Sequence, residues 1–295
     1  MDMSVAHQEA AVRSRADAPL RVAYQGVEGS YSHLTAQRRY AGRPGGALLT
    51  GHDSFRAAAG AVIDGACDLA LLPIENTTAG SINETYDLLA GGALHITGEE
   101  VSAIEHCLLA LPGVGLDELR TVISHPQALA QCQDLFAAHP HLVARPDLDT
   151  AGAARRVAEA HDRALAAIAS SAAATRYGLA IVRRNIQSAT GNATRFVEVG
   201  LRPAPVPDGA IAKTSLVFAL ADRPGVLGEI LTRLAARSLS LTKLESRPIP
   251  EAPFTYRFYA DVRGHAASAP FHAALDDIRP LTTELRVLGT YASAV

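Results

Sequence analysis

Short apolar runs alternate with segments of helical spacing along the first 200 residues. Helix-spaced apolar positions lie between these runs, for example in residues 54–64 and 127–137. Alternation of this kind predicts an α/β domain with a largely parallel sheet, or two such lobes. The strand-like runs are residues 21–25, 68–73, 94–111 (two runs), 121–124, 164–170 and 194–199.

A proline-rich stretch separates this region from a second pattern. Residues 201–209 carry three prolines, which favour a stiff, extended linker. Beyond it the order strand, helix, strand, strand, helix, strand predicts a ferredoxin-like βαββαβ domain. We therefore predict four parts, namely an N-terminal tail (1–20), a larger domain (21–200), a linker (201–212) and a smaller domain (213–292).

Composition narrows the possible partners. The 295 residues include 27 Lys+Arg and 30 Asp+Glu, so the formal net charge is −3, and this balance argues against a nucleic-acid-binding surface. Lys213 and Lys243 are the only lysines. No apolar run approaches the roughly 20 residues that span a bilayer, so no membrane partner is expected. Three cysteines without a C-x-x-C pair argue against disulfides, and together with the absence of a secretory signal they favour the cytoplasm.

Four polar clusters follow predicted strands, where α/β sheets bind their ligands. Each could be an ordinary helix cap or loop, but all combine neutral polar residues or Arg with a strand end or helix start. Together they indicate a site for an anionic, oxygen-rich small molecule. Metal-ligand spacing, a G-x-G-x-x-G motif and a P-loop lysine are all missing, so no metal or cofactor is expected. The clusters are residues 75–81, 124–131, 149–152 and 192–196, and we expect helices to begin at Gly80–Ser81, after a Ser124 cap, and at Asp149–Thr150.

In order along the chain, these clusters resemble the motifs of the prephenate dehydratase family, including its arogenate dehydratase branch. The resemblance extends from Arg21 to Tyr291, and the smaller domain is similar to an ACT regulatory domain. The catalytic-domain motifs are YQGVEGSYS (24–32), LPIEN (72–76), HCLL (106–109), SHPQAL (124–129), DTAGAA (149–154) and N-x-TRF (192–196). The ACT-like motifs are RPGVL (223–227) and LTKLESRP (241–248).

The resemblance implies a two-lobed α/β catalytic domain similar to type II periplasmic binding proteins, with the site in the cleft. Lobe 1 would comprise residues 21–100 plus 186–200, and lobe 2 residues 101–185. The implied reaction converts prephenate to phenylpyruvate, CO2 and water without a cofactor, and Thr194 would be the proton or hydrogen-bond donor to the leaving hydroxyl. Helix N-termini and Arg195 would bind the substrate carboxylates. The implied substrate-binding residues are Glu75, Asn76, Ser81, Ser124, Gln131, Thr150, Arg195 and Phe196.

The same resemblance implies feedback regulation by L-Phe, bound between paired ACT domains of a homodimer or homotetramer. Two departures limit the resemblance. Ser240 stands where many members have Asn, which bears on regulation by L-Phe, and residues 188–191 (SATG) in the catalytic domain differ from the usual loop before the TRF motif. An arogenate dehydratase and a non-catalytic amino-acid sensor are alternatives, although a sensor would be expected to lose the intact TRF motif. The implied L-Phe-binding residues are Gly225, Val226, Leu227, Ser240, Leu241, Glu245, Ser246 and Arg247.

Overall fold

The computed structural model describes residues 18–249 and 252–294. They form two compact units, one made of the chain up to Gly80 together with Ser102–Arg195, the other of Ser81–Val101 together with the chain from Phe196 onward. Of the tail predicted for residues 1–20, residues 1–17 lie outside the described part, and Leu20 already begins the first strand. No helix in the described residues is long and apolar enough to cross a membrane.

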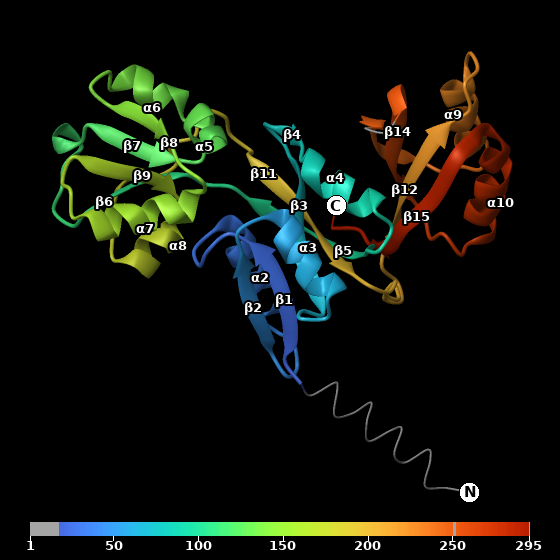
Figure 1. The fold of residues 1–295 in the computed structure, drawn as a ribbon, viewed down its shortest axis with the longest axis horizontal. Coiled ribbons are helices and arrows are strands. Elements are labelled where there is room, and N and C mark those ends of the chain that lie inside the picture. Colours follow the sequence, from blue (N-terminus) through green and yellow to red (C-terminus); the bar gives the residue numbers. More distant parts are fainter. Residues whose placement is uncertain (1–17, 250–251, 295) are drawn as a thin grey trace, which may run out of the picture. The chain divides into compact units, whose positions relative to one another are not determined.

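The first sheet has the strand order β2-β1-β3-β11-β5, with β4 paired to β3. Its first three strands are parallel, and helices α2 and α3 pack against β1 (Figure 1). Both helices start at a serine, Ser30 or Ser54, whose hydroxyl accepts a backbone N–H of the first turn. The elements are β1 (Leu20–Gln25), α2 (Tyr31–Tyr40), β2 (Ala47–His52), α3 (Phe55–Ile63), β3 (Leu69–Asn76), β4 (Gly80–Ser81), α4 (Asn83–Ala90), β5 (His95–Ala103) and β11 (Ala193–Gly200).

The second sheet has the order β10-β6-β9-β7-β8 and is covered on both faces. Leu108 and Ile168 pack with the core beneath α5 and α6, whereas their neighbours Leu109 and Ala167 pack with the core beneath α7 and α8 (Figure 1). This alternation is the period of two that a strand imposes on its side chains. The elements are β6 (Cys107–Ala110), η1 (Leu116–Glu118), β7 (Thr121–Ser124), α5 (Pro126–Gln131), α6 (Gln133–Ala138), β8 (Val143–Pro146), α7 (Thr150–Ala160), β9 (Leu165–Ala169), α8 (Ser171–Tyr177) and β10 (Ala180–Arg183).

Two predicted helices differ in the structure. The helix expected over residues 127–137 is two short helices, because Cys132 leaves helical geometry at φ −115° and ψ 30°. The helix expected to open with Gly80–Ser81 instead begins at Asn83, and Gly80–Ser81 form the short strand β4. The mixed α/β class predicted from the sequence is confirmed.

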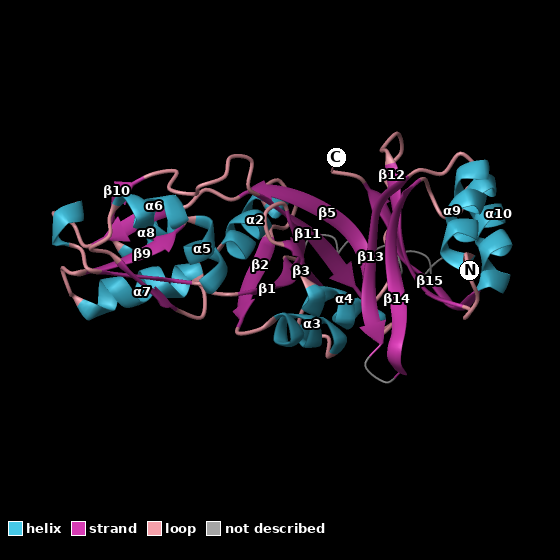
Figure 2. Cartoon of the chain, turned by 90° about the horizontal axis from the view of Figure 1, so that it is seen from above, coloured by secondary structure: helices cyan, strands magenta, loops and turns pink. Residues whose placement is uncertain are grey.

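The C-terminal elements follow the predicted βαββαβ order. The sheet order is β13-β14-β12-β15, and every pair is antiparallel. Figure 2 shows α9 and α10 side by side on one face of this sheet, where Phe218, Ile230 and Phe271 belong to one core. The elements are β12 (Ala212–Leu220), α9 (Val226–Ala236), β13 (Leu241–Ile249), β14 (Ala252–Arg263), α10 (Ala269–Ile278), η2 (Arg279–Leu281) and β15 (Thr282–Ala292).

Both lysines of the chain attach this sheet to residues 81–101 of the same unit. Lys213 on β12 forms an ion pair with Glu99 on β5, with 2.6 Å between Nζ and Oε1, and both side chains are buried. Lys243 on β13 donates a 3.0 Å hydrogen bond to the hydroxyl of Ser81. The 81–101 segment is therefore bound to the C-terminal sheet by specific polar contacts.

Candidate active site

The side chain of Asn76, the last residue of β3, lies at the centre of a buried polar network. Its Oδ1 accepts hydrogen bonds from the backbone N–H groups of Thr78 (3.1 Å) and Ala79 (2.9 Å), and its Nδ2 donates to the carbonyl of Ala193 (3.1 Å). A backbone N–H can only donate and a carbonyl can only accept. These backbone groups therefore fix which end of the Asn76 amide is the donor.

Thr194 on β11 receives a hydrogen bond from this fixed donor. Asn76 Nδ2 lies 3.0 Å from the Thr194 hydroxyl oxygen, and Thr194 is 7% exposed. Within residues 18–249 and 252–294, Asn76 is the only hydrogen-bond partner of that hydroxyl. Because the oxygen accepts from Asn76, the hydroxyl hydrogen is left to donate to a bound molecule.

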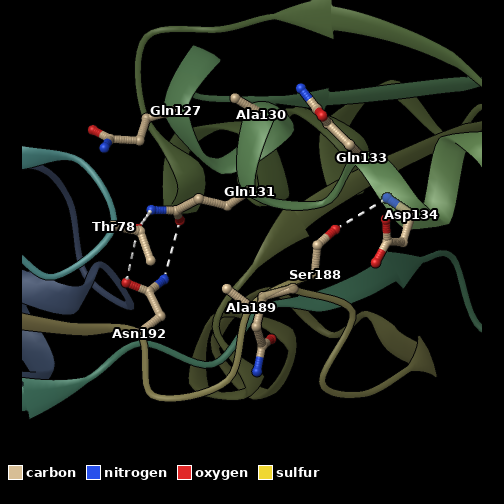
Figure 3. A pocket seen from close by; sticks show the side chains of 10 residues that line it. Thr78, Gln127, Ala130, Gln131, Gln133, Asp134, Ser188, Ala189 and Asn192 are labelled. Carbon is tan, nitrogen blue, oxygen red and sulfur yellow. Dashed lines mark hydrogen bonds between the residues drawn. The ribbon is translucent and has the colours of Figure 1, made fainter.

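Gln131 is the last residue of α5, a helix that packs on the second sheet, and it completes the network. Its Nε2 donates to the hydroxyl of Thr78 at 2.6 Å, and its Oε1 accepts from Asn192 Nδ2 at 3.1 Å. Asn192 Oδ1 in turn accepts from Asn76 Nδ2 at 2.8 Å. Figure 3 shows Thr78, Gln131 and Asn192 joined by hydrogen bonds at one side of a cavity.

This cavity has a volume of about 320 Å³ and a lining of amides, hydroxyls and alanines. The size suits a small organic molecule, since ligand pockets begin at about 300 Å³. Asp134 is the one ionisable residue among the described residues that line it, and no Lys or Arg is among them. Thr194 does not line the cavity directly, but Asn76 links it to Asn192, which does.

Arg195 is paired with Glu75. Its Nε lies 3.2 Å and its Nη2 3.1 Å from Glu75 Oε2, and Arg195 is buried while Glu75 is about one third exposed. The structure pairs these two residues with each other, and the substrate-binding role expected of both stays a prediction. The neighbouring Phe196 is fully buried.

Two predicted binding residues make other contacts. Ser124 is the last residue of β7, and its hydroxyl donates to the carbonyl of Ile168 at 2.6 Å. The sequence prediction that Ser124 caps the next helix was wrong, because Pro126 takes the first helical position and leaves His125 as the cap. Thr150 opens α7 as predicted, but the carboxylate of its N-cap, Asp149, already accepts a helix N–H and disfavours a second anion there.

Ser81 lies in the second unit, outside this network. Its hydroxyl donates to Glu245 Oε2 at 2.8 Å and accepts from Lys243. The helix start expected at Gly80–Ser81 is absent from the described structure, since Ile82 is the cap of α4 and offers no side-chain hydrogen bond.

The residues predicted to bind L-Phe lie on α9 and β13. Gly225 caps α9 with φ 78°, a backbone conformation that favours glycine, and Val226 is buried beside it. Arg247 Nη2 lies 3.2 Å from Asp87 on α4. The remaining members of this set are Leu227 on α9, Ser240 just before β13, and Leu241, Glu245 and Ser246 on β13.

Two residues of the network were missed from the sequence. His106 Nε2 lies 2.9 Å from Gln131 Oε1, and Tyr31 Oη lies 2.9 Å from His106 Nδ1. Burial lowers the pKa of His106 and raises that of Tyr31 well above its ordinary value. Both residues lie within quoted motifs, YQGVEGSYS and HCLL, but an isolated histidine was interpreted as structural.

The fold and site define an α/β protein with a cavity of small-molecule size whose described hydrogen-bond donors are mainly amides and hydroxyls, followed by a βαββαβ domain. No group of three or more His, Cys, Asp or Glu side chains in the described residues is placed to hold a metal ion. Residues 22–204 match the family model for prephenate dehydratase, and residues 214–269 match the ACT domain. The chain therefore belongs to the prephenate dehydratase family and has a C-terminal ACT domain. It is thus a lyase-type enzyme of phenylalanine biosynthesis.

Named relatives and solved structures are similar to most of the chain. The chain is 42% identical over 281 residues to arogenate dehydratase/prephenate dehydratase 2 of Arabidopsis thaliana, covering 92% of this chain and 72% of the relative. A prephenate dehydratase from Arthrobacter aurescens, solved in complex with L-Phe, has 31% identity and a TM-score of 0.83, covering 93% and 90% of the two chains. A structure described as GqqA, a novel type of quorum-quenching acylase, has 35% identity and a TM-score of 0.82, covering 93% and 98%.

Proposed function

We propose that this protein converts prephenate to phenylpyruvate, CO2 and water, with Thr194 as the proton donor to the leaving hydroxyl. The observation that carries the proposal is the fixed direction of the hydrogen bond from Asn76 Nδ2 to the Thr194 oxygen. That direction leaves the hydroxyl hydrogen of Thr194 for the substrate.

The bond changes balance without a cofactor. The electron pair of the bond between the ring and its carboxylate moves into the ring as CO2 departs. The ring becomes aromatic as the opposite carbon–oxygen bond breaks, and the oxygen leaves with that bond's electron pair. It takes a proton from Thr194 and departs as water, after which solvent returns a proton to Thr194.

A threonine hydroxyl is a weak acid, and Asn76 compensates for this. A donor to the threonine oxygen stabilises the negative charge that develops there as the proton leaves. The Asn76 amide is itself polarised, because its oxygen accepts two backbone N–H groups. A positioned acid of this kind contributes roughly 10²–10⁴-fold to a rate.

The described cavity lining contains no Lys or Arg, which also suits a decarboxylation. A cation against the ring carboxylate would stabilise the substrate more than the transition state, in which that negative charge leaves the carboxylate, and would slow the reaction. Amide donors such as those of Gln131 and Asn192 can orient the carboxylate with a weaker ground-state bond. This favours placing the reacting ring near these two amides.

Arogenate dehydratase is the second candidate function, and Asp134 is the observation that favours it. Arogenate carries an ammonium group where prephenate carries a keto oxygen, and a carboxylate in the cavity lining would attract that ammonium. We expect Asp134→Asn to lower kcat/KM for arogenate about tenfold while leaving prephenate turnover equal or higher. Equal losses on both substrates would remove Asp134 as the specificity determinant.

We further propose feedback inhibition by L-Phe at the ACT domain of a homodimer or homotetramer. The ACT match and the L-Phe complex of the Arthrobacter aurescens relative support this proposal. Isothermal titration with L-Phe should give a binding heat, and millimolar L-Phe should reduce turnover. No heat and no inhibition would reject it.

The deciding experiment is kcat/KM on prephenate and on arogenate, each with and without L-Phe. Phenylpyruvate is measured by its absorbance in alkali, and L-Phe from arogenate by chromatography. Turnover of neither substrate, with L-Phe binding retained, would favour the non-catalytic sensor. An N-acyl amide is included as a control substrate and should not be hydrolysed. An acylase needs a nucleophile beside a base, whereas the hydroxyl of Thr194 lies beside the amide of Asn76.

A further inference from the structure

The donor direction fixed at Asn76 extends along the network to Gln131. Asn76 Nδ2 donates to Asn192 Oδ1, so the opposite end of the Asn192 amide must be its donor end. That end lies 3.1 Å from Gln131 Oε1. Gln131 therefore presents its oxygen to Asn192 and its Nε2 to Thr78.

The same logic assigns the proton on His106. Gln131 Oε1 can only accept, and it lies 2.9 Å from His106 Nε2, so Nε2 must carry a hydrogen. His106 is 2% exposed, and burial favours its neutral form. Tyr31 Oη lies 2.9 Å from His106 Nδ1, but the single hydroxyl hydrogen of Tyr31 is donated to the carbonyl of Glu105 at 2.7 Å. The contact with Gln131 therefore assigns the tautomer by itself.

We propose that His106 is a positioning residue for the dehydration, acting in the tautomer that carries its hydrogen on Nε2. In this form His106 holds the Gln131 amide oxygen, so that Gln131 Nε2 points to Thr78 and supports the oriented Asn76–Thr194 pair. The catalytic consequence rests on the proposed function, whereas the tautomer does not.

The contact matters because Gln131 has a long, partly exposed side chain. Without a donor at His106 Nε2, its amide loses one of the two donors to Oε1 and can rotate within the cavity. Thr78 then loses the donor at 2.6 Å while still donating to Asn76 Oδ1 at 2.7 Å. The rate should fall by about the equivalent of one hydrogen bond, roughly tenfold.

The tautomer is tested directly by two-bond ¹⁵N–¹H correlation spectra of the full-length protein. The His106 signals are assigned by their loss in His106→Gln. We expect the pattern of a neutral ring with hydrogen on Nε2. A ring with hydrogen on Nδ1, or a charged ring at neutral pH, would overturn the proposal.

Kinetics test the positioning role. His106→Leu should lower kcat about tenfold, whereas His106→Gln, which keeps an N–H donor near the position of Nε2, should stay within about threefold of wild type. His141→Leu is the matched control, because His141 is exposed and outside the network, and it should leave kcat unchanged. Equal kcat for His106→Leu and wild type, or equal losses for both His106 variants in folded protein, would contradict the role.

The two readouts separate this inference from the proposed function. A wild-type protein that turns over neither prephenate nor arogenate, but has hydrogen on His106 Nε2, would defeat the function and the positioning role while keeping the tautomer. An active wild type with hydrogen on Nδ1 would defeat this inference alone.

Discussion

Replacing Asn76 by aspartate tests the fixed direction of the site with a change of one functional group. Asn76 Nδ2 faces three acceptors, namely Asn192 Oδ1 at 2.8 Å, the Ala193 carbonyl at 3.1 Å and the Thr194 hydroxyl at 3.0 Å. Aspartate would place a carboxylate oxygen against all three. The Thr194 hydroxyl can then rotate and donate its hydrogen to this oxygen instead of to the substrate.

The magnitudes follow from these contacts. The hydrogen bonds to Asn192 Oδ1 and to the Ala193 carbonyl are lost, at a cost of about 1 kcal/mol each, whereas the contact with Thr194 is kept with its direction reversed. The carboxylate oxygen then faces these two acceptor oxygens without a hydrogen between them, which costs about 1–3 kcal/mol more. The carboxylate strengthens the bonds from the backbone N–H groups of Thr78 and Ala79, which offsets part of this. We expect Asn76→Asp to lower the free energy of unfolding by about 2 kcal/mol and kcat by about 100-fold or more.

The assays are urea unfolding and kcat at saturating prephenate. Asn83→Asp makes the same chemical change at the exposed first residue of α4, where a negative charge is favourable, so its stability should change by less than about 0.5 kcal/mol. Lower pH should partly restore the activity of Asn76→Asp, because the protonated carboxyl again offers a donor. A folded Asn76→Asp protein with kcat within threefold of wild type would refute the directional reasoning.

Three further predictions follow from the same contacts. Thr194→Ser keeps the hydroxyl, so its kcat should stay within about tenfold of wild type, whereas Thr194→Ala should lower kcat about 100-fold or more. A kcat of folded Thr194→Ala equal to that of wild type, measured in stopped assays, would remove Thr194 from the chemistry. Lys213→Met leaves Glu99 buried without its cation and should cost about 3 kcal/mol in urea unfolding, most of it recovered in the double variant with Glu99→Gln. Burial lowers the pKa of His106 and raises that of Tyr31, so neither side chain changes charge between about pH 7 and 9. We therefore expect kcat to be independent of pH in this window. A titration step there in stopped-flow rates would show that another group controls the reaction.

The strands that the apolar pattern missed share one property. Apart from the two-residue strand β4, they are β2, β8 and β10, each an edge strand of its sheet and each without a buried residue. A strand at an edge lacks a neighbour on one side, so solvent reaches it and its apolar signal is weak. The central strands β3 and β9, almost entirely buried, produced the long apolar runs that the sequence pattern predicts.

Sequence reasoning identified candidate polar residues but not how they are joined. The structure brings Asn76, Gln131 and Thr194 into one network, and their catalytic roles remain predictions. His106 could not be assigned from the sequence, because its contacts join residues 31, 106 and 131, which only the folded chain brings together. For Ser124 the family resemblance implied substrate binding, and the structure adds a contact that the sequence does not reveal, a hydrogen bond from its hydroxyl to the neighbouring strand.

The distribution of cations connects the fold with the chemistry. Both lysines bind residues 81–101 to the C-terminal sheet, and Arg195 is paired with Glu75. The described cavity lining is consequently left with amide and hydroxyl donors, whose direction is set by backbone groups at the end of β3 and the start of β11. Uncharged donors of fixed direction can orient an anion without a strong ground-state ion pair, which is what the proposed reaction requires, because it expels a carboxylate as CO2.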